Sequence, residues 1–475
     1  MNHERPSLRL AILLPSFLAL CGTIAFAGLL GLGRWQIDEF HTGTQFREEG
    51  LSALYTRITT WSPRIFSEIL LYLYHAAVTA ADNRLIPVFY AGLWLFLILL
   101  ALAPLKLLSS HQRWLGLAFL ASLLFLCVAG QQNGEVFYWL QSSFAYMPTL
   151  ACVLFVAGVA LLDGFKNSRW VAACSAALVV AALSSETGAF FAGPFAALML
   201  VFGNFAVSRG EASRVVRRCS FAPILASAVV AYLLLNGRFG NSGEVFGDPT
   251  VAHNFWLATQ GSVLLFAKDA VLFGDNVLGG RMPWMGALAK LAFLIGATSF
   301  FVRTDANKSG ILLPIAVLGC AVFAGWFTIF GGFYQFGGHC CGRHATMEQA
   351  YIWIALAALA RVAATFVPPA IKGADAIAAV ALAMSVAVPL LLLSPKLVRD
   401  YLRYEEIVEA QSRPWVTGRD SSPEINFPRF TRGEIVQGGN DFIAPGTYER
   451  KSDTSWYPQL VMDYFGKDKL IVSPE

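Results

Sequence analysis

The sequence predicts an all-α polytopic membrane protein with about eleven transmembrane helices. Hydrophobic residues make up 56% of its 475 residues and charged residues only 14%, whereas about a quarter of a soluble domain is charged. The mean hydropathy is +0.56. The apolar residues gather in runs of about 20, the length that crosses the hydrocarbon core as a helix. These observations exclude an ordinary soluble domain.

Eleven apolar runs, each bounded by polar or charged residues, account for most of the chain. The first run is long and lacks a small-residue cleavage site, so we expect it to remain as an anchor rather than to be removed as a signal peptide. The runs are residues 8–32, 86–108, 114–129, 144–162, 170–183, 189–207, 221–235, 284–302, 311–331, 351–367 and 374–393.

The charges between these runs alternate in sign from loop to loop. With a cytoplasmic N-terminus, the inner loops carry the basic residues, as the positive-inside rule requires. These residues are Lys106, Arg113, Lys166, Arg169, Arg209, Arg214, Arg217, Arg218, Arg303, Lys308 and Lys372. The outer loops carry Asp38, Glu39, Glu48, Glu49, Glu135, Glu186, Glu244, Asp248 and Asp275. The C-terminus is then expected outside. The formal net charge of +4 requires no nucleic-acid partner, because the inner loops explain it.

Residues 63–80 test this topology. They are apolar enough to suggest a transmembrane helix. Counting them as one would move every later loop to the other side of the membrane and place the basic loops outside. We therefore expect an amphipathic helix on the outer membrane surface, with Arg64, Glu68 and His75 near the lipid headgroups. Residues 255–272 are expected to form a second helix of this kind.

The chain then divides into a transmembrane domain, 1–394, and a polar C-terminal segment, 395–475. The domain contains two long outer loops, 34–85 and 236–283. The C-terminal segment, of about 80 residues, is near the lower size for an independent domain. It is expected to begin with a short helix at 399–406 and to pack on the outer loops.

The cysteines suggest no disulfide framework, because most of the eight are single and lie inside apolar runs. The loop from His339 to His344 is different, because it contains Cys340, Cys341 and Arg343. A zinc site is one interpretation, although adjacent ligands rarely suit one tetrahedron. A disulfide between the neighbouring cysteines is another, and two separate thiols are the interpretation we favour. Arg343 is either a phosphate contact or an anchor for the next span.

Polar residues lie where three outer segments meet the apolar runs. Such residues are costly at the membrane boundary unless they are paired or face a wet cavity. Each segment taken alone can be explained as a helix end whose polar groups are hydrogen-bonded. Three such segments on the same side of the membrane favour a cavity that they share. The segments are Asp38-Glu39, Gln131–Trp139 with Ser142, Ser143 and Tyr146, and Ser184–Gly188.

The residue types in this cavity suit a sugar attached to a phosphate. Aromatic rings beside hydroxyl and amide groups match the apolar face and hydroxyl rim of a sugar, and arginine matches phosphate. A carboxylate within reach of an acceptor hydroxyl can act as general base. For Tyr138, Trp139 and Trp35, an interfacial aromatic belt is the alternative. The arginines are Arg34, Arg64, Arg281 and Arg343.

On these motifs the chain resembles the bacterial integral-membrane glycosyltransferases of the GT-C type, which use polyprenyl-phosphate sugars, and in particular a bacterial group with the same layout. The similarity covers most of the chain through short motifs. They are Asp38-Glu39 after the first run, the surface helix at 63–80, Glu135–Leu140 followed by Tyr146, Ser185-Glu186-Thr187, Arg343, and Trp456 followed by Tyr464-Phe465-Gly466. The acidic pair is commonly Asp-Asp in such enzymes and is Asp-Glu here.

The resemblance implies a periplasmic active site on a bacterial inner membrane, an inverting transfer and a cell-envelope glycan or lipid as acceptor. Asp38 is the expected base, and Glu39 is a helper, a ligand for a divalent metal or a solvated residue. No other cofactor is expected. The expected substrate-binding residues are Arg343, Arg281, Arg64, Glu135, Tyr138, Trp139, Tyr146 and Glu186.

Two other functions fit the same composition. A polymerase or ligase of lipid-linked glycans would use the loop from His339 to His344 for catalysis. A transporter or flippase of such lipids should show internal repeats and ionisable groups near mid-membrane. The sequence shows no repeat, and Lys290 is the main charged residue inside a run, where we expect it to snorkel.

Overall fold

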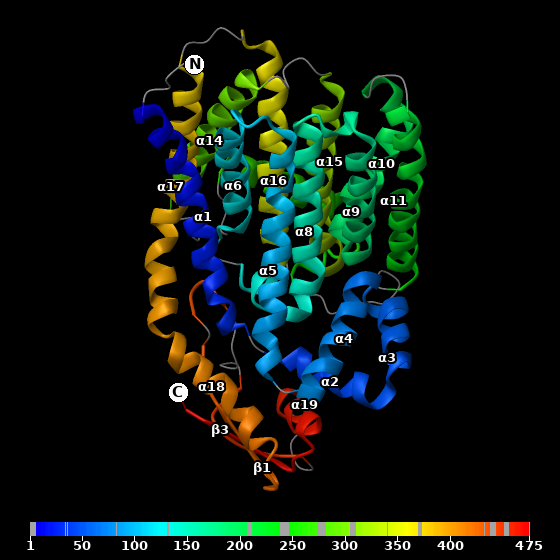
Figure 1. The fold of residues 1–475 in the computed structure, drawn as a ribbon. Coiled ribbons are helices and arrows are strands. Elements are labelled where there is room, and N and C mark those ends of the chain that lie inside the picture. Colours follow the sequence, from blue (N-terminus) through cyan, green and yellow to red (C-terminus); the bar gives the residue numbers. More distant parts are fainter. Residues whose placement is uncertain are drawn as a thin grey trace.

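A computed structural model gives the fold. It describes residues 6–33, 35, 37–81, 83–130, 133–206, 211–237, 247–272, 282–304, 310–339, 341–368, 373–431, 433–437, 443–450 and 456–474. Long helices stand side by side as one bundle, and shorter elements gather at one of its ends (Figure 1). The bundle helices are α1 (Pro6–Gly28), α5 (Ile86–Leu102), α6 (Arg113–Val128), α8 (Leu140–Leu161), α9 (Ser168–Ser184), α10 (Glu186–Ala206), α11 (Glu211–Asn236), α14 (Pro283–Arg303), α15 (Leu312–Phe336), α16 (Gly342–Ala363) and α17 (Ala374–Leu402).

The prediction of a polytopic helical membrane protein is confirmed. Among the described residues, 8 helices are long and apolar enough to cross a membrane, and they coincide with α1, α5, α8, α11, α14, α15, α16 and α17. The other three predicted runs fall on α6, α9 and α10, whose apolar stretches are shorter. The coarse architecture therefore stands, whereas the count of eleven spans remains a prediction.

Helix α8 forms the centre of the bundle. The most apolar part of α8 is 100% buried, and α5, α9 and α16 pack around it. A helix that is apolar on all sides can lie inside a protein core or against lipid, and α8 takes the inner position. The first residues of α8 therefore lie deep among other helix ends, which matters for Tyr146 below.

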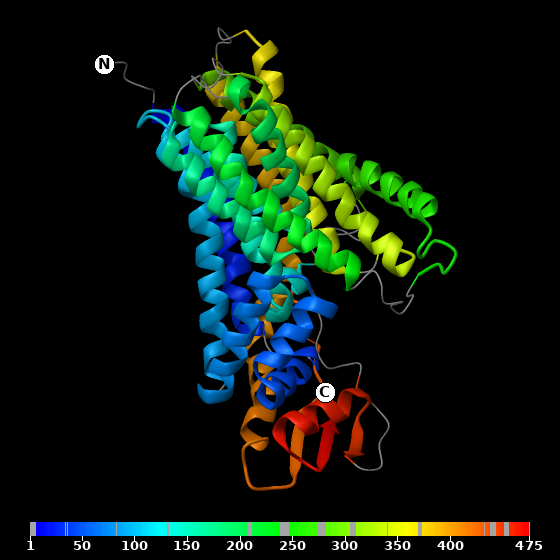
Figure 2. The same ribbon diagram turned by 90° about the vertical axis from the view of Figure 1, so that its right-hand side faces the viewer.

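The elements between α1 and α5 lie at one end of the bundle, beside the C-terminal segment (Figures 1 and 2). We call this the site end. Its elements are α2 (Ile37–Glu49), α3 (Leu51–Thr56), the π-helix η2 (Arg57–Trp61), α4 (Ile65–Ala81), α7 (Gly134–Phe137), α18 (Tyr404–Thr417) and α19 (Trp456–Phe465).

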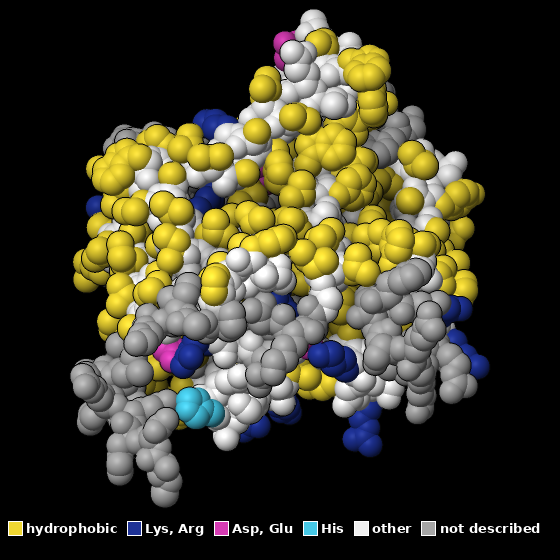
Figure 3. Space-filling view, turned by 90° about the horizontal axis from the view of Figure 1, so that it is seen from above, with side chains coloured by type: hydrophobic (Ala, Val, Ile, Leu, Met, Phe, Trp, Pro, Cys, Tyr) yellow, Lys and Arg dark blue, Asp and Glu magenta, His cyan; other side chains and the backbone are white. Residues whose placement is uncertain are grey.

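The opposite end carries the loops that the sequence marks as basic. Lys106 and Arg113 lie between α5 and α6, Lys166 between α8 and α9, and Arg303 at the end of α14. Figure 3 looks onto this end and shows Lys and Arg side chains scattered over it. The described loops that the sequence marks as basic thus share one end of the bundle, although the site end also carries arginines, among them Arg47, Arg57 and Arg64.

The C-terminal segment contains a small sheet that the all-α prediction did not include. Strand β1 (Glu424–Pro428) pairs in parallel with β3 (Lys469–Ser473), and β2 (Gly446–Glu449) pairs with β3 in antiparallel fashion. The predicted short helix at 399–406 is instead the end of α17 followed by α18. Alternating buried residues along β1 and β3 are too few to separate these strands from coil by pattern alone.

The C-terminal segment packs on residues of the segment 34–85, as predicted. Arg47 of α2 donates from Nη1 to the carbonyl of Tyr464 in α19 over 2.6 Å, and its guanidinium lies 5.4 Å from that ring. Trp35 and Phe40 contact Trp415 and Tyr464, with ring centroids 4.9–6.3 Å apart. Burying such rings is worth several kcal/mol, roughly 1.5–3 for each large side chain. These contacts hold α2 against the rest of the site end.

The position predicted for residues 63–80 is wrong in one respect. A helix forms there, but one side of α4 is buried against its neighbours, through Ser67, Glu68, Leu71, Tyr74, His75 and Val78. Glu68 and His75 are only 4% and 1% exposed, so neither reaches lipid headgroups. The spacing of apolar residues in an amphipathic helix is the same whether the helix packs on protein or lies on a membrane. The sequence alone therefore does not distinguish the two positions.

His75 is enclosed by Trp35, Tyr74 and Phe46. Its ring nitrogens have no hydrogen-bond partner among the described residues. Burial, together with the charge of Arg57, lowers the pKa of His75 to about 3. The imidazole therefore stays neutral in the folded protein at any pH above this value.

We predict that His75→Phe makes stability less dependent on pH. The unfolded chain takes up a proton at His75 near pH 6.5, but the folded chain does not until pH 3. Stability should therefore fall as the pH drops between these values, by about 1.4 kcal/mol per pH unit for one proton. Thermal unfolding in detergent between pH 7 and pH 4 measures the slope, which the Phe variant should reduce. His111→Gln, which changes an exposed ring at the opposite end, should leave the slope intact.

Candidate functional site

Asp38 lies in the first turn of α2, where Trp35 and Phe40 anchor the chain on both sides. The carboxyl is partly buried, and this burial raises its pKa. Arg343 is the strongest of three charges that oppose the shift, followed by His41 and Arg57. A carboxylate with a raised pKa binds a proton more readily, and nearby cations keep its charged form accessible.

Arg343 is held in place by Glu135. The carboxylate of Glu135 accepts hydrogen bonds from the backbone N–H of Gly342 and of Arg343, over 3.2 and 3.3 Å, and from Arg343 Nη1 over 3.3 Å. The first two bonds cap the N-terminus of α16, whose N–H groups lack partners within the helix. The guanidinium also lies 5.6 Å from the ring of Trp139, a cation–π distance. We call Asp38, Glu135, Trp139 and Arg343 the Asp38 cluster.

The position of Glu135 depends on the short helix α7. Thr346 of α16 donates to the side-chain oxygen of Asn133 over 3.1 Å, which ties the start of α7 to α16. A side chain at Gly134 would meet the backbone nitrogen of Gln437 at 2.8 Å. Glycine is therefore required where the C-terminal segment crosses α7.

Arg57 links α2, α4 and α8. Its Nε and Nη2 donate to the two oxygens of Glu68 over 2.8 and 3.4 Å, and its Nη1 donates to Thr42 over 3.3 Å. Thr42, one turn beyond Asp38 on α2, in turn donates to Gln141 of α8 over 3.4 Å. These contacts fix the helix that carries Asp38 relative to the bundle.

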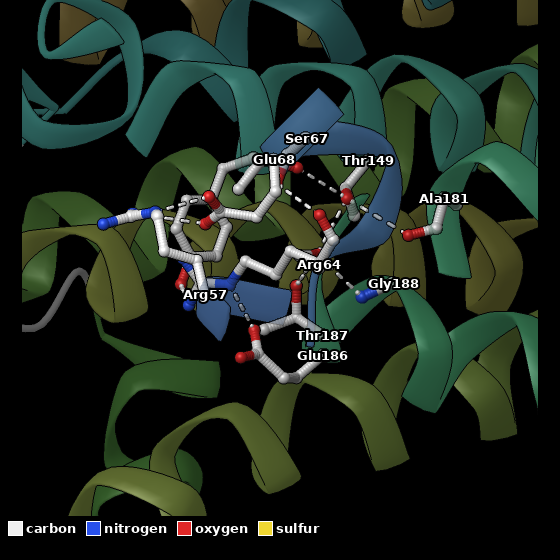
Figure 4. Close-up of polar contacts among 12 residues, drawn as sticks. Arg57, Arg64, Ser67, Glu68, Thr149, Ala181, Glu186, Thr187 and Gly188 are labelled. Carbon is white, nitrogen blue, oxygen red and sulfur yellow. Dashed lines mark hydrogen bonds and ion pairs between the residues drawn. The ribbon is translucent and has the colours of Figure 1, made fainter. Parts of the chain in front are cut away.

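A second group of polar side chains contains Arg64 and Glu186, which lie near the pair of Arg57 and Glu68 (Figure 4). Arg64 Nε donates to Glu186 over 2.8 Å and its Nη2 donates to the hydroxyl of Tyr146 over 3.0 Å. These residues line a cavity of about 50 Å³ together with Gln335 and His344. We call Arg64, Tyr146 and Glu186 the Arg64 cluster. It adjoins the Asp38 cluster through the neighbouring residues His344 and Arg343.

The segment Ser185–Thr187, between α9 and α10, is held by its own hydrogen bonds. The hydroxyls of Thr149 and Ser185 lie 2.7 Å apart, and Ser185 also accepts from the backbone N–H of Gly188 over 3.1 Å. Tyr351 donates to the carbonyl of Thr187 over 2.8 Å. The break between the two helices is therefore fixed, and it directs Glu186 toward Arg64 (Figure 4).

The structure brings most of the predicted residues together, but in two adjacent clusters rather than one shared cavity. Asp38, Glu135, Trp139 and Arg343 belong to the first cluster, and Arg64, Tyr146 and Glu186 to the second. Arg281 lies outside the described residues.

Two predicted residues lie in positions that the sequence did not indicate. Glu39 is 0% exposed, so it is not a solvated member of the acidic pair; it points away from Asp38 because adjacent helical residues cannot share a face. Tyr138 is also buried, and its hydroxyl donates to the carbonyl of Phe26 over 2.7 Å. This bond joins α1 to the core and leaves Tyr138 neither in an interfacial belt nor against a sugar.

The expectation of separate thiols at the paired cysteines is wrong for Cys341, which is disulfide-bonded. Cys340 lies outside the described residues. Within the described parts of the chain, no group of three or more His, Cys, Asp or Glu side chains is placed to hold a metal ion.

Sequence reasoning missed Arg57 and Gln335. Arg57 follows an exposed helix and lies far along the chain from Thr42 and Gln141, so only the fold shows that it joins them. Gln335 ends a long apolar run, and a polar residue at the end of a span is usually at the membrane boundary. Its position at the membrane boundary is the only feature of the sequence that marks Gln335, and this position is equally compatible with a cavity residue and with a solvated one.

A larger cavity, of about 650 Å³, lies at the opposite end of the bundle and is lined by His111, Gln112, Arg303 and Asp375 among others. Arg303 donates to both oxygens of Asp375 over 2.9 Å, so these charges satisfy each other. None of the predicted site residues lines this cavity.

Comparisons of the chain with protein-family models, with curated proteins and with solved structures found no match. The chain is therefore assigned to no family, and its function has to be argued from the site itself.

We predict that Glu135→Ala destabilises the protein more than Glu135→Gln. Alanine leaves two helix N–H groups and the Arg343 guanidinium without their acceptor, a loss of about 1–3 kcal/mol. Glutamine keeps a carbonyl oxygen for the backbone and loses only the charge. Thermal unfolding of the purified variants measures the difference. Equal melting temperatures for the two variants would show that Glu135 does not cap α16.

Proposed function

We propose that the protein is a glycosyltransferase that moves a sugar from a polyprenyl-phosphate donor to a cell-envelope glycan or lipid acceptor. The observation that carries the proposal is the position of Asp38. It is a partly buried carboxyl with a raised pKa, opposed by Arg343 and Arg57, at the end of an apolar helix bundle. This combination is what a general base for a hydroxyl acceptor needs.

The proposed reaction assigns one event to each group. The acceptor oxygen attacks the anomeric carbon of the donor from the face opposite the phosphate, and its proton passes to Asp38. The bond between the anomeric carbon and the phosphate oxygen breaks, and the phosphate leaves with the electron pair. Arginine donors stabilise the negative charge that grows on that phosphate in the transition state. The configuration at the anomeric carbon is inverted in this single displacement.

The same proposal places the site on the periplasmic side of a bacterial inner membrane, with a cytoplasmic N-terminus and a periplasmic C-terminus. Its support is the separation of charges, because the basic loops lie at the end opposite Asp38 and basic loops favour the cytoplasm. Donor sugars attached to a lipid reach such a site from within the bilayer. Glu39, being buried away from Asp38, is not assigned a catalytic step.

A transporter of lipid-linked sugars is the second candidate, because charged side chains do lie inside the bundle. Lys290 is 4% exposed, Asp269 7% and Glu348 1%. Lys290 does not snorkel, however. Its ammonium group donates to the carbonyls of Asp269 and Leu272 at the C-terminal end of α12 (Phe255–Val271), where a cation stabilises the helix. A helix cap explains Lys290 without a transport cycle. The third function, a glycan polymerase or ligase, would depend on Arg343 and His344 and little on Asp38.

We predict that Asp38→Asn lowers sugar transfer by at least about 100-fold, the usual contribution of a general base, while the protein still folds. The assay is product formation by the purified protein in lipid vesicles, followed by mass spectrometry, with a panel of polyprenyl-phosphate sugars. Glu48→Gln is the matched control, because Glu48 lies on the same helix with its side chain 65% exposed. Full activity of Asp38→Asn would refute the assignment of the base.

The pH dependence of transfer should follow the charge on Asp38. Because the base acts when deprotonated and its pKa is raised, the acidic limb of kcat/KM should lie above the ordinary aspartate value of about 3.9. Arg343 lowers that pKa, so Arg343→Gln should move the limb to higher pH. Arg413→Gln, at the site end with its side chain 55% exposed but not among the charges that act on Asp38, should leave the limb in place. A limb that moves to lower pH in Arg343→Gln would contradict the proposal.

A further inference from the structure

An apolar groove runs between α10 and α11 and meets the cavity of the Arg64 cluster. It has a volume of about 250 Å³ and is lined mainly by small or apolar residues, among them Gly193, Ser227, Ala228 and Ala231. Phe190 and Leu234 line both the groove and the cavity. The groove and the cavity therefore adjoin each other, and the groove is apolar whereas the cavity is polar.

The groove opens toward the surroundings of the bundle. Ala228 of α11 is exposed, and the same helix exposes Leu225 and Tyr232 to 66% and 65%. Exposed apolar side chains of this size on a bundle helix face lipid in a membrane protein. A chain lying in the bilayer can thus reach the groove without crossing water.

The polar cavity contains hydrogen-bond donors for which the described residues offer no acceptor. Gln335 is 8% exposed and lines the cavity, and its amide makes no hydrogen bond to another described residue. Arg64 uses Nε and Nη2 for Glu186 and Tyr146, and no described residue accepts a hydrogen bond from its Nη1. A buried amide without a partner costs free energy unless a ligand or water supplies one. The cavity of about 50 Å³ exceeds the room that a single water needs, about 10–15 Å³.

We propose that this space binds a lipid phosphate, with its apolar chain in the groove between α10 and α11 and its phosphate at Arg64 and Gln335. The phosphate oxygens accept from Arg64 Nη1 and Gln335 Nε2. The group that directly follows the chain in such a lipid is the phosphate, which matches the order in which the groove and the cavity are joined. The inference rests on the proposed function, and it assigns the phosphate to the Arg64 cluster rather than to Arg343. Arg343, held by Glu135, then serves to lower the pKa of Asp38.

The test is binding of farnesyl phosphate to the full-length protein in detergent, measured by the shift in thermal unfolding as the ligand concentration increases. Farnesol, which lacks the phosphate, and inorganic phosphate, which lacks the chain, separate the two contributions. The proposal predicts that farnesyl phosphate binds at least about tenfold more tightly than either. Equal binding of inorganic phosphate would show a site for the free ion and overturn the proposal, as would equal binding of farnesol.

Two variants test the location. Ala231→Phe fills the groove and should weaken farnesyl phosphate binding by about tenfold or more. Val229→Phe, on the same helix but not lining the groove, should bind as the parent does. Gln335→Leu should weaken farnesyl phosphate about tenfold and leave farnesol unchanged. Unaltered binding in both Ala231→Phe and Gln335→Leu would place the lipid elsewhere.

Photo-crosslinking keeps the inference testable if a variant does not fold. A farnesyl phosphate with a diazirine on its chain should label peptides of α10 and α11 in the unmodified protein, as read by mass spectrometry. Labels confined to other helices would overturn the proposal. Correct labelling without sugar transfer from any donor would instead refute the proposed function and leave the lipid site in place.

Discussion

The site end depends on the partial removal of one carboxylate, Asp38, from water. An ionised carboxylate loses hydration on burial, and only nearby positive charge or hydrogen bonds can offset that loss. Arg343, His41 and Arg57 supply the charge, yet each arginine is itself held by a glutamate, Glu135 or Glu68. The arginines are therefore fixed in place and do not simply neutralise Asp38 by direct pairing. Its pKa stays raised, which is the property that makes it suitable as a base.

The helices around Asp38 hold its carboxyl group and the two arginines at fixed distances from one another. The first turn of α16 places Arg343 where its charge acts on Asp38 and places His344 in the cavity that Arg64 also lines, so a single helix start serves both clusters. The C-terminal segment closes over α2 through Trp415 and Tyr464 and reaches α7 at Gly134. A segment that looks in the sequence like a polar tail is thus part of the wall around Asp38. The proposed division of roles follows, with proton transfer at the Asp38 cluster and phosphate binding at the Arg64 cluster.

The sequence could predict the bundle because apolar length and loop charge depend on local composition. Each apolar run lies on a helix, and the short segment with Glu135 was recognised by its polar residues at a boundary. The pairing of these residues could not be predicted, because it depends on contacts between distant parts of the chain, such as Arg64 with Glu186. For the same reason His75 and Glu68 were placed at a lipid surface when they pack on protein. Of the roles that the sequence left open for Glu39, burial excludes that of a solvated residue.

The most direct test of this account is an electron cryomicroscopy map of the protein in lipid nanodiscs with a non-hydrolysable polyprenyl-phosphate sugar. The account predicts ligand density at the site end, with the sugar beside Asp38, the phosphate at Arg64 and Gln335, and the chain between α10 and α11. Density in the larger cavity at the opposite end, beside His111 and Arg303, would contradict it.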